Sequence, residues 1–325
     1  MELIRGQHNL RSRHHGSVVT IGNFDGVHLG HQAVLAQLVE KSQQLGVPGV
    51  IAMFEPYPQE FFSARDDHGR RAPARLTRLR EKLQSLRRYA VDRVLCLRFN
   101  QQFAAQSAAD FIEQLLVGQL GVKCLIVGDD FRFGYRRQGD LAMLQAAGER
   151  YGFQVINMHT FNVDGDRVSS TRIREALRQG DLNTASKLLG RPYHMSGRIV
   201  HGDKRGRSIG FPTANIYLHR HVSPLRGIYA VSVFGLDREP VDGVANIGTR
   251  PSIDGKRCLL EVHLFDFDAE IYGCHVQVVF ISRLRDEQRF ESLSALQQQI
   301  AMDVQQARSL FEDQGEQIRH LQVKC

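Results

Sequence analysis

The chain has 325 residues, 42% of them hydrophobic and 24% charged, which is the composition of an ordinary globular protein long enough for two domains. No apolar run approaches the roughly 20 residues that a membrane-spanning helix needs, and no apolar signal segment follows Met1, so we expect no membrane partner. The net charge of +7 would suit a nucleic-acid binder, but the positive charges are spread along the chain without an RNA-binding signature, so we favour a protein that binds several phosphorylated ligands.

The first predicted element is a strand that leads through a turn into a helix. Residues 18–21 are a short β-branched run typical of a buried strand, and residues 22–26 contain the Gly, Asn and Asp of a turn. From His28 onward the apolar residues recur at helical spacing. This order predicts the first βα unit of a nucleotide-binding α/β sheet, in which the helix N-terminus attracts phosphate.

His28 and His31 lie one turn apart, so both should project from the same face of that helix. Gly30 between them has no side chain to keep a phosphate away. Two imidazoles beside a phosphate site suit in-line attack at phosphorus, where negative charge develops on non-bridging oxygens. An arbitrary H-x-G-H could instead be a turn with two surface histidines. A metal site is a weaker hypothesis, because no third or fourth ligand lies nearby with suitable spacing.

The strand and helix patterns continue to alternate through the first half. We expect further buried strands at residues 50–54, 91–97, 124–127 and 153–158, and helices at residues 76–86 and from the capping Ser107 to residue 120. The Arg and Lys residues of the 76–86 helix are expected on its solvated face. Prolines after the second strand, followed by Phe62, form either a rigid turn or an aromatic wall for a flat ligand.

Residues 169–174 begin another predicted helix. Ser170 or Thr171 could cap it, and capping alone would explain both. Arg172 and Arg174 oppose the helix dipole there unless an anion lies between them, so we favour a phosphate-binding function.

The alternation ends with a helix at about residues 181–189. Six short strands follow and predict a small antiparallel barrel, against which a final amphipathic helix from about residue 290 to 310 should pack. These strands are expected at residues 199–200, 214–217, 228–234, 241–247, 259–267 and 276–281.

Two segments of the predicted barrel could carry chemistry. The Gly-rich basic loop of residues 202–210 is either a flexible hairpin or, with Thr213 and Asn215 on one face of the next strand, a cover for phosphates and Mg²⁺. Strand alternation places Glu261 and His263 on one face. From the pattern alone, we favour a solvent-exposed face over a functional site.

Read together, these motifs resemble the bacterial bifunctional riboflavin kinase/FAD synthetase family. Its first domain is matched by G-x-F-D-G-x-H-x-G-H at residues 22–31, F-E-P-x-P at 54–58, V-G-x-x-F-x-F-G at 127–134 and S-S-T-x-I-R at 169–174. Its kinase module is matched at residues 201–215, 243–251, 260–267 and 284–290. The chain departs from the family pattern at Tyr57, where His is usual, and at Asp130, where Asn is frequent.

The resemblance implies a Rossmann-like α/β domain with a parallel sheet over residues 1–184, which adenylylates FMN, and a six-stranded antiparallel β-barrel with a terminal helix over residues 185–325, which phosphorylates riboflavin. ATP would serve both reactions and Mg²⁺ the kinase reaction, with FMN and FAD as products. Catalytic roles would fall to His28, His31, Arg172 and Glu261. The first domain would bind ATP through Gly22, Asn23, Phe24, Asp25, Gly26, Gly30, Ser170 and Thr171, and flavin through Pro56, Pro58, Phe62 and Asp130. The kinase would bind ATP through Gly202, Lys204, Gly206 and Gly210, and metal through Thr213 and Asn215.

Two alternatives stay open. The chain could be an H-x-G-H nucleotidyltransferase for another phosphate monoester, with a barrel that only recognises substrate, or the barrel could bind RNA. The five cysteines are scattered without C-x-x-C spacing, so we expect reduced thiols in the cytoplasm. The oligomeric state does not follow from the sequence.

Overall fold

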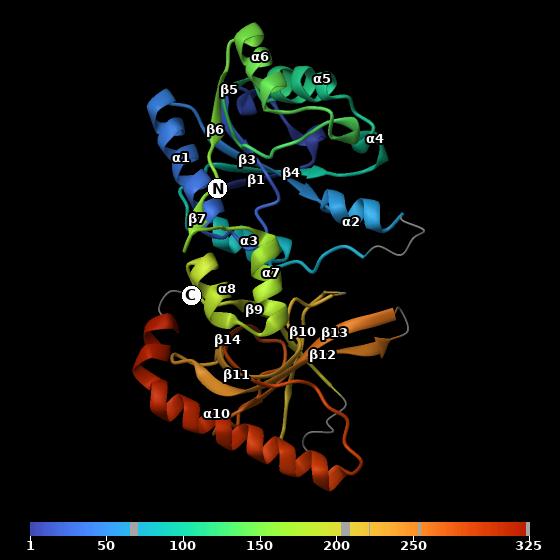
Figure 1. Cartoon of the computed structure of the whole chain (residues 1–325), viewed down its shortest axis with the longest axis vertical. Coiled ribbons are helices and arrows are strands. Elements are labelled where there is room, and N and C mark those ends of the chain that lie inside the picture. Colours follow the sequence, from blue (N-terminus) through green and yellow to red (C-terminus); the bar gives the residue numbers. More distant parts are fainter. Residues whose placement is uncertain (66–70, 203–208, 221, 253–254, 323–325) are drawn as a thin grey trace. The chain divides into compact units, whose positions relative to one another are not determined.

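The structure, a computed structural model, describes residues 1–65, 71–202, 209–220, 222–252 and 255–322 (Figure 1). The chain divides into two compact units. The first unit contains Met1–Pro73 and Lys82–Val168, and the second contains Ala74–Glu81 and Ser169–Cys325.

The first unit is built on a six-stranded sheet with the order β1-β4-β3-β2-β5-β6, in which every neighbouring pair is parallel. Its strands are β1 (Glu2–Arg5), β2 (Ser17–Ile21), β3 (Gly49–Glu55), β4 (Arg93–Arg98), β5 (Val122–Gly128) and β6 (Gln154–Met158). The predicted α/β fold is confirmed, and apolar runs account for five of the strands. The edge strand β1 has only two apolar residues, too few for a pattern.

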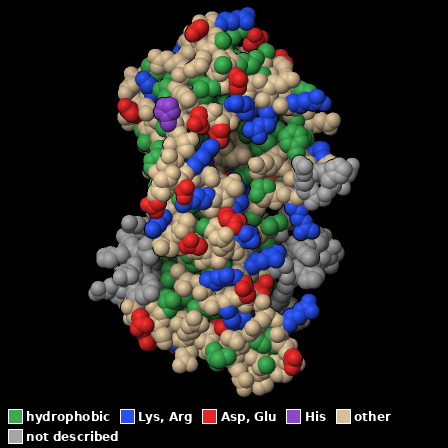
Figure 2. Space-filling model, in the orientation of Figure 1, with side chains coloured by type: hydrophobic (Ala, Val, Ile, Leu, Met, Phe, Trp, Pro, Cys, Tyr) green, Lys and Arg blue, Asp and Glu red, His purple; other side chains and the backbone are tan. Residues whose placement is uncertain are grey.

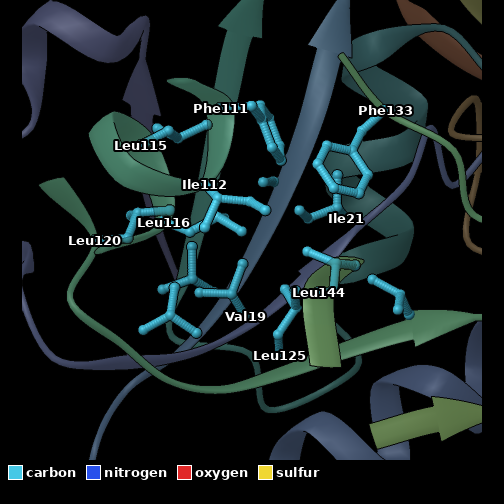
Figure 3. Packing of buried hydrophobic residues seen from close by; sticks show 14 of the residues in the cluster. Val19, Ile21, Phe111, Ile112, Leu115, Leu116, Leu120, Leu125, Phe133 and Leu144 are labelled. Atoms are coloured by element: carbon cyan, nitrogen blue, oxygen red, sulfur yellow. The ribbon is translucent and has the colours of Figure 1, made fainter. Parts of the chain in front are cut away.

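Helices cover both faces of this sheet. On one face the π-helix η3 (Phe111–Gln119) packs Phe111 and Leu115 into a cluster with Val19 of β2 (Figure 3). On the other face lies α1 (Leu29–Leu45), since a Cβ atom at Gly49 would contact Leu38. Each large apolar side chain buried in this way contributes about 1.5–3 kcal/mol relative to exposure.

The remaining elements of the first unit are short. The helices are η1 (Gln7–Asn9), η2 (Ser12–His14), α2 (Pro58–Ser63), α4 (Gln101–Ala104), α5 (Ala108–Asp110), η4 (Tyr135–Arg137) and α6 (Leu141–Tyr151). The hairpin strands are β7 (Asn162–Val163) and β8 (Asp166–Arg167). Ser107 caps α5 as expected, because its side chain accepts from the backbone N–H of Asp110.

Two helix starts differ from the sequence predictions. Helix α3 (Leu79–Leu86) begins three residues later than expected, because the Glu81 carboxylate accepts from the backbone N–H of Arg78 and fixes the first turn there. Helix α7 (Ser170–Gln179) is capped by Ser169, not by Ser170 or Thr171. Ser169 has the extended backbone of an N-cap, and its hydroxyl accepts from the N–H of Arg172 at 3.2 Å.

The second unit is a closed barrel with the strand order β10-β13-β12-β11-β14-β9, and all neighbouring strands are antiparallel. Its strands are β9 (His194–Val200), β10 (Ala214–Tyr217), β11 (Gly227–Phe234), β12 (Val241–Ser252), β13 (Gly255–Leu264) and β14 (His275–Arg285). The six predicted strands are confirmed as elements, and β9, β12 and β14 extend well beyond the predicted ranges. The prediction for β13 was shifted, because this strand begins at Gly255 and ends at Leu264, before the turn at residues 265–266.

Helices complete the barrel unit. They are α7, α8 (Leu182–Leu189) and the terminal α10 (Leu293–Gln322), which packs on β11, β12 and β14 (Figure 1). Arg285 holds α10 to β14, because its guanidinium donates to both carboxylate oxygens of the buried Asp303, at 2.8 and 2.7 Å. The predicted packing of an amphipathic C-terminal helix on the barrel is confirmed.

The barrel strands have an apolar face and a polar face. Leu260 and Val262 of β13 and Ile247 of β12 are fully buried on one side. Because side chains alternate along a strand, Glu261 lies on the opposite side of β13.

Candidate active sites

The turn after β2 lies at the carboxyl edge of the parallel sheet, where the strand order changes direction: β3 lies on one side of β2 and β5 on the other. Ligands of open α/β sheets bind at this position. The turn is tightly wound, because Phe24, Gly26 and Val27 all have positive φ angles of 49°, 85° and 45°. Asp25 is buried within it. Strained backbone of this kind is concentrated at functional sites.

The two histidines lie together at the start of α1. Their rings stack with centroids 3.6 Å apart, which confirms that they share one face. His28 is the N-cap of α1, and its Nδ1 accepts from the backbone N–H of His31 at 3.3 Å. Because Nδ1 is the acceptor, the neutral form of the His28 ring carries its proton on Nε2. A Cβ atom at Gly30 would lie 3.3 Å from Nδ1 of His28, so a side chain there would press on the ring.

The surroundings of His31 favour its neutral form. Burial lowers the pKa of His31 well below its ordinary value of 6.5, and the nearby His28 and Lys82 lower it further. Its Nδ1 is buried and has no hydrogen-bond partner among the residues that the structure describes. A buried polar atom of this kind is expected to find its partner in a ligand.

Lys82 is part of this site and contradicts the expectation of a solvated face for the α3 cations. It is fully buried; its Nζ donates to the carbonyl oxygen of Asn23 and lies 4.5 Å from the centroid of the Tyr57 ring. The Tyr57 hydroxyl in turn donates to Asp25 at 3.2 Å. The sequence did contain a signal, because position 82 falls on the apolar stripe of Leu79, Leu83 and Leu86.

The predicted flavin residues lie after β3 and β5. Pro56 is exposed and Pro58 is the first residue of α2. Phe62 is 55% exposed, and its ring meets the edge of Phe99 at a centroid distance of 5.8 Å, so it presents an aromatic surface. Asp130 is exposed and forms an ion pair with Arg167.

Ser170, Thr171 and Arg172 form the first turn of α7 and belong to the second unit, whereas His28 and His31 belong to the first. Thr171 is exposed and Ser170 and Arg172 are partly buried. Arg174, which suggested an anion, has a structural contact instead: its Nε donates to the carbonyl oxygen of Ala74 at 2.7 Å.

In the barrel, Asn215 and Glu261 lie side by side. Asn215 of β10 is directly opposite Glu261 of β13 in the antiparallel register, and Asn215 is buried. Thr213 directly precedes β10 and is partly buried. A Cβ atom at Gly202 would overlap the Asn215 side chain, so only glycine permits this close approach.

The glycine-rich loop is described only at its ends. Gly210 has a φ of 83°, a conformation that favours glycine. Lys204 and Gly206 lie outside the described residues.

His263 positions the segment before Asn215, a role that the sequence did not reveal. Its Nδ1 lies 2.9 Å from the carbonyl oxygen of Pro212, to which it donates, and its ring meets the edge of Phe211 at 5.4 Å. The predicted shared face of Glu261 and His263 was the available signal.

Comparisons with known proteins agree with this architecture. Residues 10–172 match the family model described as FAD synthetase, and residues 189–311 match the model described as riboflavin kinase. The chain is 53% identical over 312 residues to the bifunctional riboflavin kinase/FMN adenylyltransferase of Escherichia coli (strain K12), covering 96% of this chain and 98% of that protein. It is 51% identical over 311 residues to the protein of the same name from Haemophilus influenzae, covering 96% of this chain and 99% of that protein.

A solved structure titled "Crystal Structure of Macrolide-efflux Protein from Streptococcus pneumoniae" aligns with a TM-score of 0.77 and 30% identity, covering 93% of this chain and 97% of that chain. Within the described part of this chain, no helix is long and apolar enough to cross a membrane. The two family matches, the order of the two units and the near full-length identity to named relatives lead to one assignment: the chain belongs to the family of bifunctional riboflavin kinases/FMN adenylyltransferases.

Proposed function

We propose that the chain carries out the two reactions of its family at two separate sites: riboflavin and ATP give FMN at the barrel, and FMN and a second ATP give FAD and pyrophosphate at the α/β domain. The observation that carries this proposal is that each family match contains its own cluster of polar side chains, the stacked histidines in residues 10–172 and the Asn215–Glu261 pair in residues 189–311.

For the division of labour we assign residues 1–184 to adenylylation and residues 185–325 to phosphorylation. Helices α7 and α8 pack with the barrel unit. Residues 170–172 nevertheless stay with the adenylylation assignment, because the FAD synthetase match extends to residue 172.

In adenylylation, a phosphate oxygen of FMN attacks the α-phosphorus of ATP, and the bond to the pyrophosphate oxygen breaks. The FMN phosphate is already ionised, so the reaction needs no general base, and catalysis consists of positioning and charge stabilisation. His28 and His31 would donate N–H groups to the non-bridging oxygens, His31 in the neutral form that its burial favours, and Arg172 would add positive charge. Gly30 and the turn of residues 22–26 leave room for the phosphates, with Ser170 and Thr171 as further contacts.

The flavin would lie against Phe62, whose exposed ring supplies a flat apolar surface that the buried Phe61 and the partly buried Phe99 hold in place. Pro56 and Pro58 would stiffen this wall. Asp130 would contact the ligand only through a carboxylate already shared with Arg167.

In phosphorylation, Glu261 would accept the proton of the ribityl 5′-hydroxyl as its oxygen attacks the γ-phosphorus of ATP and ADP leaves. Lys204 and the glycines of residues 202–210 would cover the phosphates. The Thr213 hydroxyl and the Asn215 amide oxygen are the hard oxygen ligands that Mg²⁺ prefers, and the close approach of position 202 to Asn215 requires glycine there. When bound there, Mg²⁺ would neutralise charge on the phosphates.

We further propose that riboflavin, FMN and ATP are the ligands, without nucleic acid, and that the chain acts in the cytoplasm. On the face in Figure 2, Lys and Arg side chains are interspersed with Asp and Glu rather than gathered into one basic stripe. Cys96, Cys124, Cys258 and Cys274 are free thiols, which suits a reducing compartment.

The decisive experiment is to incubate the protein with riboflavin and Mg-ATP and to separate the flavins by chromatography. Wild type should form FMN and FAD, whereas Glu261→Gln should form FMN about 10²–10⁴ times more slowly, which is the usual share of a positioned acid or base. The lower end is expected, because a loose phosphoryl-transfer transition state leaves the proton on the hydroxyl until late. FAD formation from supplied FMN should not change. A near-wild-type kinase rate in Glu261→Gln would remove Glu261 from the mechanism.

A further inference from the structure

Glu261 lies between two asparagines in the middle of the barrel sheet. Asn215 of β10 is directly opposite Glu261 on one side, and Asn246 of β12 is directly opposite it on the other. Side chains at directly opposite positions of antiparallel strands point to the same face, with Cβ atoms about 4.5–5.5 Å apart. Asn215, Glu261 and Asn246 therefore form one polar row across three strands, on the face away from the buried Leu260 and Val262.

The amide oxygen of Asn246 lacks a donor. Its Oδ1 is buried and has no hydrogen-bond partner within the described part of the chain. An ionised Glu261 only accepts hydrogen bonds, so it can receive a bond from the Asn246 amide group but cannot satisfy Oδ1. A buried acceptor without a donor costs free energy, so a ligand with a donor group is the expected partner.

The ligands of the proposed kinase reaction differ in what they offer. ATP phosphates are acceptors and cannot pair with an amide oxygen, whereas the hydroxyls of a ribityl chain are donors. The donors of the adenosine group are separated from the γ-phosphate by the rest of the triphosphate, and those of the flavin ring lie at the far end of the ribityl chain. The secondary hydroxyl next to the attacking 5′-hydroxyl is therefore the nearest available donor.

The order of Asn215, Glu261 and Asn246 across the three strands also favours this hydroxyl as the partner of Asn246. In the proposed function Asn215 lies on the phosphate and metal side of Glu261, so Asn246 lies on the other side of the base. In an in-line transfer the acceptor alcohol extends away from the phosphates. The carbon chain that carries the attacking hydroxyl would pass Asn246.

We propose that Asn246 binds substrate in the kinase reaction: its Oδ1 accepts a hydrogen bond from the 4′-hydroxyl of riboflavin and so orients the 5′-hydroxyl on Glu261. This proposal rests on the proposed role of the barrel site. It makes Asn246 a determinant of specificity for polyol acceptors, because an acceptor without the neighbouring hydroxyl leaves the amide oxygen unpaired.

The test combines a protein change with a substrate change in the full-length chain. Riboflavin and 4′-deoxyriboflavin are phosphorylated by wild type and by Asn246→Ala. We expect Asn246→Ala to lower kcat/KM for riboflavin by about 10–100-fold. Wild type should show a similar decrease in kcat/KM when 4′-deoxyriboflavin replaces riboflavin. Combining the two changes should lower kcat/KM little further, as for groups in direct contact. Losses that multiply, or an Asn246→Ala rate equal to wild type, would overturn the proposal.

Control measurements keep the outcome clear. FAD formation from supplied FMN should be unchanged in Asn246→Ala. Asn246→Leu, which keeps the size of the side chain but has no acceptor oxygen, replaces it if the alanine variant does not fold. Asn157 of β6 also has a buried amide oxygen without a partner, but it lies in the first unit, so Asn157→Ala should leave riboflavin phosphorylation unchanged. A raised requirement for Mg²⁺ in Asn246→Ala would make Oδ1 a metal ligand and overturn the hydroxyl contact. Glu261→Gln, measured in parallel, reports separately on the base.

Discussion

At the scale of single residues, His28 has two roles that a simple alanine variant would confuse. Its ring caps α1 by accepting from the backbone N–H of His31, and the same ring is proposed to face the phosphates. Loss of an N-cap typically costs about 1 kcal/mol of stability. The loss of a preorganised donor in the transition state costs rate instead.

Replacing His28 with Asn separates these roles, because Asn is a strong N-cap but cannot reproduce the imidazole. The free energy of unfolding of His28→Asn should lie within about 1 kcal/mol of the wild-type value. It should form FAD from FMN about 10²–10³ times more slowly, as should His31→Ala. Thermal unfolding and the two half-reactions, each assayed alone, provide the measurement. Riboflavin phosphorylation is the internal control, and an equal loss of both activities would contradict the division between the sites.

At the scale of elements, the barrel unit depends on a segment more than a hundred residues upstream of it. The Arg220 guanidinium donates to the carbonyl oxygens of Arg75 and Leu76 and to the Glu81 carboxylate, at 2.5, 3.3 and 2.7 Å. The Arg220 and Glu81 side chains are only 3% and 2% exposed. A buried ion pair is costly to break, because the remaining charge loses its partner without regaining water.

This contact predicts the behaviour of a fragment that begins at Ala185 and so lacks residues 74–81. The fragment should be less stable than the barrel unit in the whole chain by about 3–5 kcal/mol, the usual cost of breaking a buried pair. Arg220→Met should destabilise the whole chain, where it leaves Glu81 unpaired, and should change the stability of the fragment much less, because the fragment contains neither Glu81 nor the carbonyl groups of residues 75 and 76. Denaturant unfolding of the four proteins tests this difference. An equal loss in both backgrounds would mean that Glu81 is not the partner that matters.

The same elements explain how far the sequence could predict the structure. Local periodicity predicts β2, α8 and the six barrel strands, because the apolar pattern of each can be recognised within a short stretch of sequence. It does not predict that residues 74–81 join the barrel, that Lys82 is buried, or that Asn246 lies beside Glu261, since each depends on packing or register between distant segments. Motif matches indicated the histidine pair and Glu261, but not the neighbours that orient them.

At the scale of the whole molecule, the two proposed sites share one compound. FMN is the product of the kinase reaction and the substrate of adenylylation. The histidine pair belongs to the first unit and Glu261 to the second, and each has its own supporting residues. Each site can therefore be inactivated without touching the side chains of the other.

The last prediction follows from this separation. A mixture of Glu261→Gln, which should keep adenylylation, and His31→Ala, which should keep phosphorylation, should form FAD from riboflavin and Mg-ATP, although neither variant should do so efficiently alone. The reason is that FMN released by one molecule is a free substrate for the other. The rate should rise with the concentration of the Glu261→Gln partner and should be abolished by adding an enzyme that removes phosphate from free FMN. FMN that stops at about one equivalent of His31→Ala, with no FAD in the mixture while Glu261→Gln still converts supplied FMN, would mean that the kinase product is not released, and would show that the two sites work only within one molecule.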